Sequence, residues 1–299
     1  MNLSDNKEVF SDIVSIVSEE LGLARSIIEK DYYSMLFLKK LVEFDNNIIF
    51  KGGTSLSKCF KIINRYSEDL DLNYVGDATN SKRKQIKNKI KEIAEELHLS
   101  IPNIEGTRSR RDFNKYLLDY NPLYRNDSIK ENIIVEVALQ IPSFPHVEKK
   151  CSSYIYDYLN AIERYDLINE FELEPFTIKV QSLERTFVDK VFALCDYYLS
   201  SNGERNSRHL YDLNKIYEKI DILSIKLLIE EVRNVRKNNP VCYSCKDNID
   251  IQFVLKQIVD TDFYKKDYID ISSKLIAPLE YSNYSYDKVI SLLSKLSMF

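Results

Sequence analysis

The sequence predicts an α+β protein in which an α/β part is followed by a largely α-helical part. Apolar residues recur at helical spacing in Val9–Leu21 and Ile27–Val42, so two helices open the chain. Short β-branched runs, which are typical of strands, follow them. After Phe176–Val180 the pattern is helical almost to the end of the sequence. We therefore divide the chain into residues 1–170 and residues 171–299.

Three segments of the first part have the character of strands. Ile48–Phe50 is short and apolar and ends at a glycine pair, after which a helix is expected as far as Ile63. Leu70–Tyr74 alternates apolar and polar residues, as a half-buried strand does. Asn132–Leu139 is dense in β-branched residues, which predicts a strand in the interior of a sheet.

The composition is that of an ordinary globular protein. The 299 residues are 44% hydrophobic and 29% charged, and the formal net charge is −4. No run approaches the roughly 18 uncharged apolar residues of a membrane span, and no signal-peptide pattern is present. We expect a cytoplasmic protein without a membrane partner.

Two features of the sequence have alternative interpretations. The basic run Ser81–Lys91, with a second group beyond it at Arg108, Arg110, Arg111 and Lys115, has two interpretations. It is either a path for nucleic-acid phosphates, or a solvated helix face followed by a charged loop. The five cysteines include a C-x-x-C pair, Cys242 and Cys245. No second pair accompanies it, so reduced thiols are the expectation and the role of the pair stays open.

A glycine pair separates the first predicted strand from the helix that follows. The sequence there is Lys51, Gly52, Gly53, Thr54 and Ser55. Glycine lets the backbone approach a phosphate closely, and the hydroxyl residues could add hydrogen bonds. A Gly-Gly pair between a strand and a helix is more often a tight turn with no ligand, and the pattern is not a Walker loop.

Two carboxylates follow at Asp69 and Asp71. On a strand, residues two apart project from the same face, so these carboxylates are predicted to point together. Neighbouring carboxylates repel one another unless a cation lies between them, and oxygen ligands of this kind suit Mg²⁺ or Mn²⁺. The alternative is an edge strand with two solvated acids.

Together, the glycine turn and the D-x-D pattern give the layout of the DNA polymerase beta-like nucleotidyltransferases. The sequence also resembles a narrower family, the AbiEii/MenT-type toxins of abortive-infection and toxin–antitoxin systems. The segments that carry this resemblance are residues 29–32, 50–58, 65–72, 180–194 and 208–213.

The resemblance implies a fold, substrates and site residues. The fold would be a polymerase beta-like palm, a mixed sheet flanked by helices, with the helical part completing the active site. An NTP would be the substrate, an RNA, by resemblance the 3′ end of a tRNA, the acceptor, and an antitoxin protein a partner. In the family a lysine and an aspartate of the helical part belong to the site, which correspond here to Lys190 and Asp212. Glu136, on the predicted interior strand, would be a third metal ligand.

Helical periodicity supports a special role for Lys190. The residue falls in the same helical sector as Leu183, Phe187 and Leu194, so its ammonium should face inward and need a carboxylate or a phosphate as partner. Snorkelling to the edge of the core is the alternative. Asp212 lies four residues after Arg208, and a surface ion pair would explain both.

The predicted reaction is in-line attack by an RNA hydroxyl on the α-phosphorus of an NTP, which releases pyrophosphate. Of two metal ions, one would be held by Asp69 and Asp71 and the second would neutralise charge on the triphosphate and the leaving group. One alternative keeps the fold but transfers nucleotide or phosphate to a protein hydroxyl. Another is a module that binds nucleotide or a partner without catalysis. A purely structural helical scaffold would leave an inward lysine and the D-x-D pair unexplained.

Overall fold

The computed structural model describes residues 2–76, 78–125 and 131–299, in two compact units. The first unit comprises Met1–Phe60, Glu68–Pro142 and His146–Val180. The second comprises Lys61–Ser67, Ser143–Pro145 and Gln181–Phe299. Two short excursions of the chain therefore belong to the second unit, and each unit is described by itself below.

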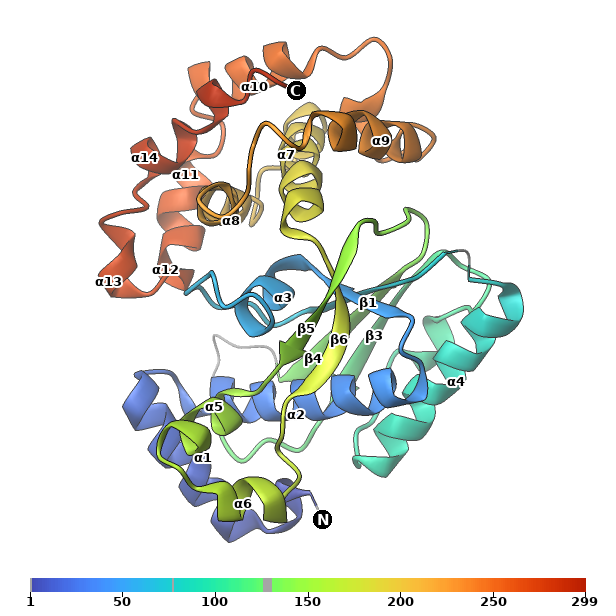
Figure 1. Ribbon diagram of the computed structural model, residues 1–299, viewed down its shortest axis with the longest axis vertical. Helices are drawn as coiled ribbons and strands as arrows, with labels where there is room; N and C mark the ends of the chain where they lie inside the picture. The colour runs from blue at the N-terminus through green and yellow to red at the C-terminus, as the bar shows by residue number, and fades with distance from the viewer. Residues whose placement is uncertain (1, 77, 126–130) are drawn as a thin grey trace. The chain divides into compact units, whose positions relative to one another are not determined.

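The first unit contains a sheet and most of the helices predicted for the first part of the chain (Figure 1). Its helices are α1 (Lys7–Leu21), α2 (Arg25–Phe44), α3 (Gly52–Lys58), α4 (Asn80–Glu96), α5 (Tyr154–Ala161) and α6 (Tyr165–Glu170). Its strands are β1 (Ile48–Lys51), β2 (Leu70–Tyr74), β3 (Phe113–Asp119), β4 (Asn132–Ala138), β5 (His146–Cys151) and β6 (Phe176–Gln181).

The strands form one mixed sheet in the order β3-β4-β2-β1-β6-β5. β1 is antiparallel to β2 and parallel to β6, while β2 is parallel to β4, which is antiparallel to β3. The prediction of an interior strand at residues 132–139 is confirmed, because β4 lies between β3 and β2. The expected α+β architecture, a mixed sheet flanked by helices, is confirmed as well.

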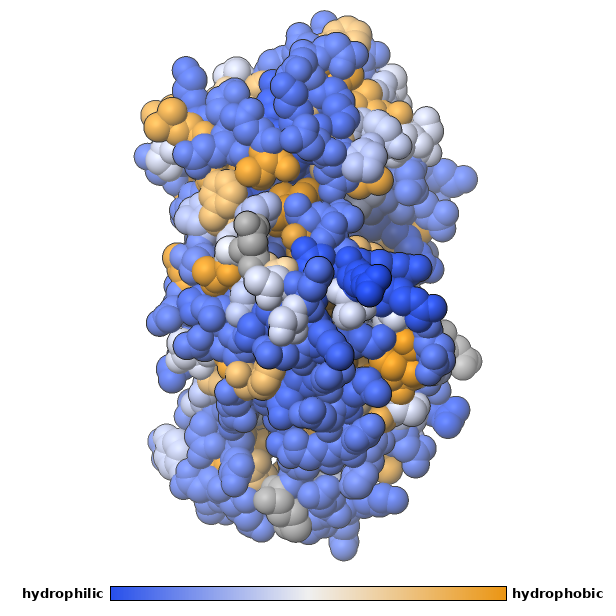
Figure 2. Space-filling model, turned by 90° about the vertical axis from the view of Figure 1, so that its right-hand side faces the viewer, coloured by the Kyte–Doolittle hydropathy of each residue, from blue (hydrophilic) through white to orange (hydrophobic). Residues whose placement is uncertain are grey.

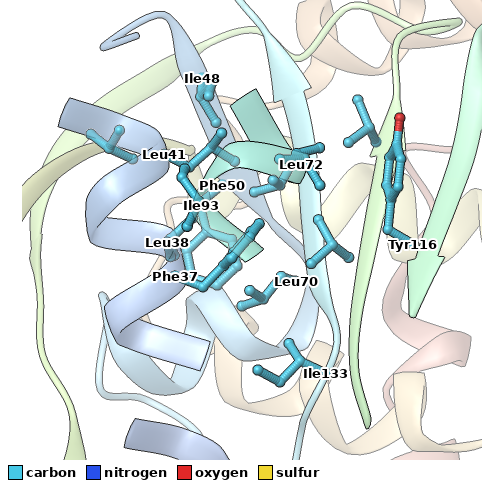
Figure 3. Close-up of a cluster of buried hydrophobic side chains, with 14 of the residues drawn as sticks. Phe37, Leu38, Leu41, Ile48, Phe50, Leu70, Leu72, Ile93, Tyr116 and Ile133 are labelled. Carbon is cyan, nitrogen blue, oxygen red and sulfur yellow. The ribbon is translucent and has the colours of Figure 1, made fainter. Parts of the chain in front are cut away.

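One face of the sheet packs against α2 and α4 to form the main core (Figure 3). Phe37, Leu38 and Leu41 of α2 contact this face, and Ile93 of α4 joins the same cluster. Because side chains alternate across a strand, the apolar residues of β2 and β4 face this core. Their polar neighbours, including Asp71 and Glu136, are therefore on the opposite face of the sheet.

Local signals in the sequence explain where the helices begin and end. Asn6 caps α1 by accepting a hydrogen bond from the Val9 amide, and Gly22 ends the helix in the left-handed conformation. Thr79 caps α4 in the same way. A second apolar cluster joins α1, the start of α2, α5 and α6 around Phe10 and Ile28.

The second unit is largely helical, as predicted. Its helices are α7 (Leu183–Leu199), α8 (Arg208–Tyr217), α9 (Lys226–Arg236), α10 (Ile251–Asp260), α11 (Lys265–Asp267), α12 (Ser273–Leu275), α13 (Pro278–Tyr281) and α14 (Tyr286–Ile290). Ser182 caps α7, which packs against α8, α9 and α10. Phe187, Val191 and Leu194 of α7 are fully buried in this unit.

Two expectations about the first unit were wrong. The helix after the glycine pair ends at Lys58 and does not reach Ile63. The chain leaves the helix there because Lys61–Ser67 belongs to the second unit, where the Asn64 amide donates to the Tyr211 hydroxyl at 3.0 Å. The charged segment around Lys115 is not a loop throughout, because Lys115 lies on β3, at the edge of the sheet.

The face shown in Figure 2 is mostly hydrophilic, with scattered apolar side chains. Among the residues that the structure describes, no helix is both long and apolar enough to cross a membrane.

Candidate active site

A row of four charged residues crosses the sheet on the face opposite the main core. Lys51 of β1 is in register with Asp71 of β2, Asp71 with Glu136 of β4, and Glu136 with Lys115 of β3. Residues in register project to the same side of a sheet. The row therefore places two acids side by side with a lysine at each end. Asp69 lies one residue before β2 begins.

The glycine turn and the D-x-D pattern meet at Gly52 and Asp71. Gly52 has a φ of +78°, a conformation that favours glycine. A Cβ atom at this position would lie 1.9 Å from Oδ2 of Asp71. Only glycine therefore allows the backbone at the start of α3 to approach this carboxylate so closely.

The hydroxyl residues after the glycine pair are buried. The Ser55 hydroxyl donates a hydrogen bond to the Gly52 carbonyl at 2.9 Å, and Ser55 is fully buried. Thr54 is buried beside it. The Ser55 hydroxyl thus stabilises the turn, while Lys51, Gly52 and Gly53 are half-buried.

The pKa of Lys115 is affected by the negative charges of the neighbouring acids. Its Nζ donates to Oε1 of Glu136 at 2.9 Å. Burial lowers the pKa of Lys115, but this hydrogen bond and the negative charges of Glu136, Asp69 and Asp71 outweigh burial and raise the pKa. The negative charges of both D-x-D carboxylates therefore contribute to the raised pKa of Lys115.

The acids of the site suit a metal ion held by two carboxylates rather than one enclosed by protein ligands alone. Within residues 2–76, 78–125 and 131–299, no three His, Cys, Asp or Glu side chains are close enough to hold a metal ion. The Glu136 carboxylate is bound by Lys115. Mg²⁺ is commonly held by one or two carboxylates together with substrate phosphates, and the donor set of Asp69 and Asp71 fits that mode.

The motif at residues 29–32 lies on α2 and contacts the segments that carry the site. Lys30, which is 2% exposed, forms an ion pair with Glu68, the residue before Asp69. Asp31 accepts the Tyr154 amide at 2.7 Å and lies 2.5 Å from the ammonium of Lys58 at the end of α3. Side chains of α2 thus hold the segments before β2 and after the glycine turn.

The remaining residues of this motif bind other segments of the first unit. Glu29 accepts hydrogen bonds from the amides of Leu123 and Tyr124, at 2.8 and 3.1 Å. The Tyr32 hydroxyl accepts the Ser4 amide at 3.2 Å. The residues of this motif therefore hold segments of the first unit together, a structural role that the sequence pattern did not indicate.

In the second unit, Lys190 and Asp212 form an ion pair. Lys190 Nζ lies 2.7 Å from Oδ2 of Asp212, and both residues are buried. The inward orientation of Lys190 predicted from periodicity is confirmed. The alternative of a surface pair between Asp212 and Arg208 was wrong, because Asp212 is fully buried and binds Lys190 and Arg65.

Arg65 is the residue of this cluster that sequence reasoning missed. Its Nε and Nη2 donate to the two oxygens of Asp212 at 2.6 and 2.7 Å. His209 Nδ1 lies 3.3 Å from Lys190 Nζ. Arg65 stands 147 residues before Asp212, and only its place in the motif at residues 65–72 could have drawn attention to it.

The cluster carries more positive than negative charge. Burial lowers the pKa of Lys190, and the positive charges of Arg65 and Arg208 lower it further, so that Asp212 offsets only part of the effect. Burial and the ammonium of Lys190 also hold the pKa of His209 well below its usual value. Burial would raise the pKa of Asp212, but Arg65 and Lys190 together lower it. The two cations share one carboxylate.

The C-x-x-C pair shows no sign of thiolate chemistry. Cys242 and Cys245 are buried in the second unit as free thiols. Burial raises the pKa of both, to about 11 for Cys242. Thiols with raised pKa values are poor nucleophiles at neutral pH.

Comparison with known proteins identifies the family. The model of the "Nucleotidyl transferase AbiEii toxin, Type IV TA system" family matches residues 36–280. The chain therefore belongs to the AbiEii family of nucleotidyltransferase toxins, and it is a nucleotidyltransferase. Membership implies an NTP substrate and an antitoxin partner.

Two solved structures are similar to the chain. The nucleotidyltransferase toxin MenT4 (Rv2826c) from Mycobacterium tuberculosis H37Rv is 16% identical, with a TM-score of 0.47 over 95% of this chain and 98% of that chain. JHP933 from Helicobacter pylori is 16% identical, with a TM-score of 0.41 over 90% of each chain. No curated protein sequence compared with the chain matches it.

Proposed function

We propose that the protein transfers NMP from an NTP to a hydroxyl of an RNA, with the 3′ end of a tRNA as acceptor, in a reaction that depends on Mg²⁺ or Mn²⁺. One observation carries the proposal. The backbone of Gly52 lies against the carboxylate of Asp71, so a loop able to receive phosphates adjoins an acidic pair.

Asp69 and Asp71 would hold the metal. Two carboxylates leave coordination positions for phosphate oxygens, which suits a metal that arrives with its nucleotide. When bound, the metal supplies charge neutralisation on the triphosphate and a lower pKa for the attacking hydroxyl. Glu136 stays our proposed third ligand, although Lys115 would have to release it first.

The chain itself would bind and orient the triphosphate. Phosphates could approach the peptide groups of Gly52 and Gly53 closely because glycine has no side chain of its own. Lys51, in register with Asp71, would place a cation beside the same phosphates. Thr54 and Ser55 belong to this segment, and Ser55 would act through the hydrogen bond that shapes the turn.

We extend the proposal to Lys190 and Asp212 as residues that the reaction requires. The surplus positive charge around Lys190 supports a role in offsetting negative charge as it develops. Asp212 would hold that ammonium in place, and Arg65 would fix the carboxylate of Asp212.

The surroundings in which the protein works belong to the same proposal. We place it in the cytoplasm as the toxin of a toxin–antitoxin or phage-defence system, where NTPs and tRNA are available. The competing acceptor is a protein hydroxyl, for example on the antitoxin. The other competitor is a module that binds nucleotide without catalysis.

Labelling with each nucleotide tests the proposal. Purified protein is incubated with bulk tRNA, Mg²⁺ and each α-³²P-labelled NTP in turn. Asp71→Asn removes one charge from the acidic pair, and Asp12→Asn removes one from an exposed aspartate of α1 as the matched control. We expect label on RNA with the wild type and the Asp12 variant, and a loss of more than about 100-fold with Asp71→Asn.

The other outcomes separate the competitors. Label on protein without label on RNA would show that the acceptor is a protein, and the proposed active site would stand. Absence of label on any macromolecule, with NTP still bound, would favour the binding module. Activity that survives chelation of divalent cations would remove the metal from the proposal.

A further inference from the structure

A basic surface adjoins the carboxylate row at the edge of the sheet. It consists of an arginine turn, defined here as residues 108–111, and the outward-facing residues at the start of β3. Arg108, Arg110, Arg111, Phe113 and Lys115 are all exposed. Figure 2 views the side on which α4 lies in Figure 1, and its most hydrophilic residues gather in one patch.

The surface and the row share one face of the sheet. Lys115 belongs to both, and Phe113, two residues earlier on β3, projects to the same side. From the spacing of strands and of residues along them, the Cα atoms of Phe113 and Asp71 are about 12 Å apart. A ligand on Phe113 could therefore reach the acidic pair with one short, extended segment.

The arginine turn is held in a defined conformation. The buried Asn114 side chain accepts the Arg108 amide at 2.9 Å and donates to the Arg108 carbonyl at 3.0 Å. On the other side of β3, the Asn103 side chain donates to the Lys115 carbonyl and accepts the Leu117 amide, at 2.8 and 3.0 Å. The sheet edge is thereby covered, so its outward side chains, and not its backbone, are available to a partner.

The chemistry of this surface fits a single-stranded nucleic acid. Guanidinium groups bind phosphates, and two acids in the region are already engaged, since Asp112 pairs with Arg83 and Glu136 with Lys115. An aromatic ring that is 43% exposed, as Phe113 is, offers a stacking platform for a base. A protein acceptor would require neither of these features.

We propose that the arginine turn, Phe113 and Lys115 form the binding surface for the acceptor RNA and direct its single-stranded 3′ end toward Asp69 and Asp71. The inference rests on the proposed function and deepens it, because it names the residues that bind the acceptor. Arg110 contacts a phosphate, and Phe113 stacks on a base close to the end that reacts.

Binding measured without NTP tests the surface separately from the reaction. The anisotropy of a fluorescein-labelled, short single-stranded RNA is followed with the full chain at several salt concentrations. Arg110→Ala should weaken binding roughly fivefold near 0.1 M salt and reduce the slope of log K against log salt by about 0.7, the loss of one phosphate contact. Arg164→Ala removes an exposed arginine elsewhere in the first unit and should bind as the wild type does.

Phe113→Ala should weaken binding at least about fivefold with an unchanged salt slope, because stacking involves no net charge. Tyr165→Ala, which removes an exposed aromatic ring of α6, is its control. If the wild type binds RNA and both Arg110→Ala and Phe113→Ala bind it equally well, the proposed binding surface is wrong, although the result of the RNA labelling would still stand. If the wild type binds no RNA and labels only protein, the acceptor proposal and this inference both fall.

Discussion

Each unit of the protein buries a lysine against an aspartate, and the two pairs differ in their surroundings. In the first unit Lys58 lies 2.5 Å from Asp31 and 3.0 Å from the centre of the Tyr154 ring. In the second, Lys190 lies 2.7 Å from Asp212, which also binds Arg65. The distances are similar, but the number of cations for each carboxylate is not.

The pKa values of the two lysines move in opposite directions as a result. Burial lowers the pKa of Lys58, but Asp31 and the other acidic groups around it outweigh burial and raise the pKa. Burial lowers the pKa of Lys190, and Asp212, shared with Arg65, does not compensate. The Lys58 ammonium is therefore balanced by the acidic groups around it, whereas the Lys190 cluster holds more positive than negative charge, which is the charge that the proposed function would use.

The largest effect should come from removing the shared carboxylate. Asp212→Asn leaves Arg65 and Lys190 buried side by side and should lower stability by about 5 kcal/mol, whereas Asp31→Asn leaves one ammonium and should cost about 3 kcal/mol. Differential scanning calorimetry of both variants measures the difference. A greater loss for Asp31→Asn would contradict the idea that Asp212 serves two cations.

Removing the lysines should destabilise the two units in the opposite order. Lys58→Met leaves the Asp31 carboxylate buried with its cation gone and should cost about 3 to 5 kcal/mol. Lys190→Met leaves Asp212 paired with Arg65, so the cost should stay within about 1 kcal/mol. Thermal unfolding and the labelling assay separate the two roles, since Lys190→Met should be stable and inactive. Equal destabilisation by both changes would show that Lys190 is structural.

A pair of glycines extends the comparison to the carboxylate row. Gly52 and Gly22 both have positive φ, but a Cβ would meet no atom within 4 Å at Gly22. Gly22→Ala should therefore cost only the conformational strain of about 1 kcal/mol, and Gly52→Ala about 2 kcal/mol, because Asp71 must also move. Only Gly52→Ala should abolish RNA labelling. Full activity of that variant would exclude the Gly52–Asp71 contact from the site.

The smallest effect is the acid dependence that Asp212 contributes. Because Arg65 and Lys190 lower its pKa below the ordinary 3.8, its contribution to stability is complete above that pH and is lost as the pH falls. If Asp212 stays ionised in the folded protein, the loss between pH 5 and pH 3 is about 1 kcal/mol. The free energies of unfolding of the wild type and Asp212→Asn should therefore converge by that amount between pH 5 and pH 3. Parallel pH profiles would mean that the pKa of Asp212 is not lowered.

Residues close in sequence explain which parts of the site could be predicted. The D-x-D spacing and the glycine pair are local patterns, and the structure places them in contact at Gly52 and Asp71. Helical periodicity correctly oriented Lys190. By contrast, Arg65 and the Lys58–Asp31 and Lys30–Glu68 pairs join segments far apart in the chain, for which no periodicity exists.

The order of helices and the main strands, and the inward lysine, follow from local patterns of apolar and polar residues, because these patterns reflect which side of an element is buried. Residue patterns could not reveal that Lys61–Ser67 interrupts the first unit to supply Arg65 to α8. Nor could they show that Lys115 lies on an edge strand in register with Glu136. Strand pairing and ion pairs depend on distant segments meeting in space, and no local pattern of residues shows which distant segments will meet.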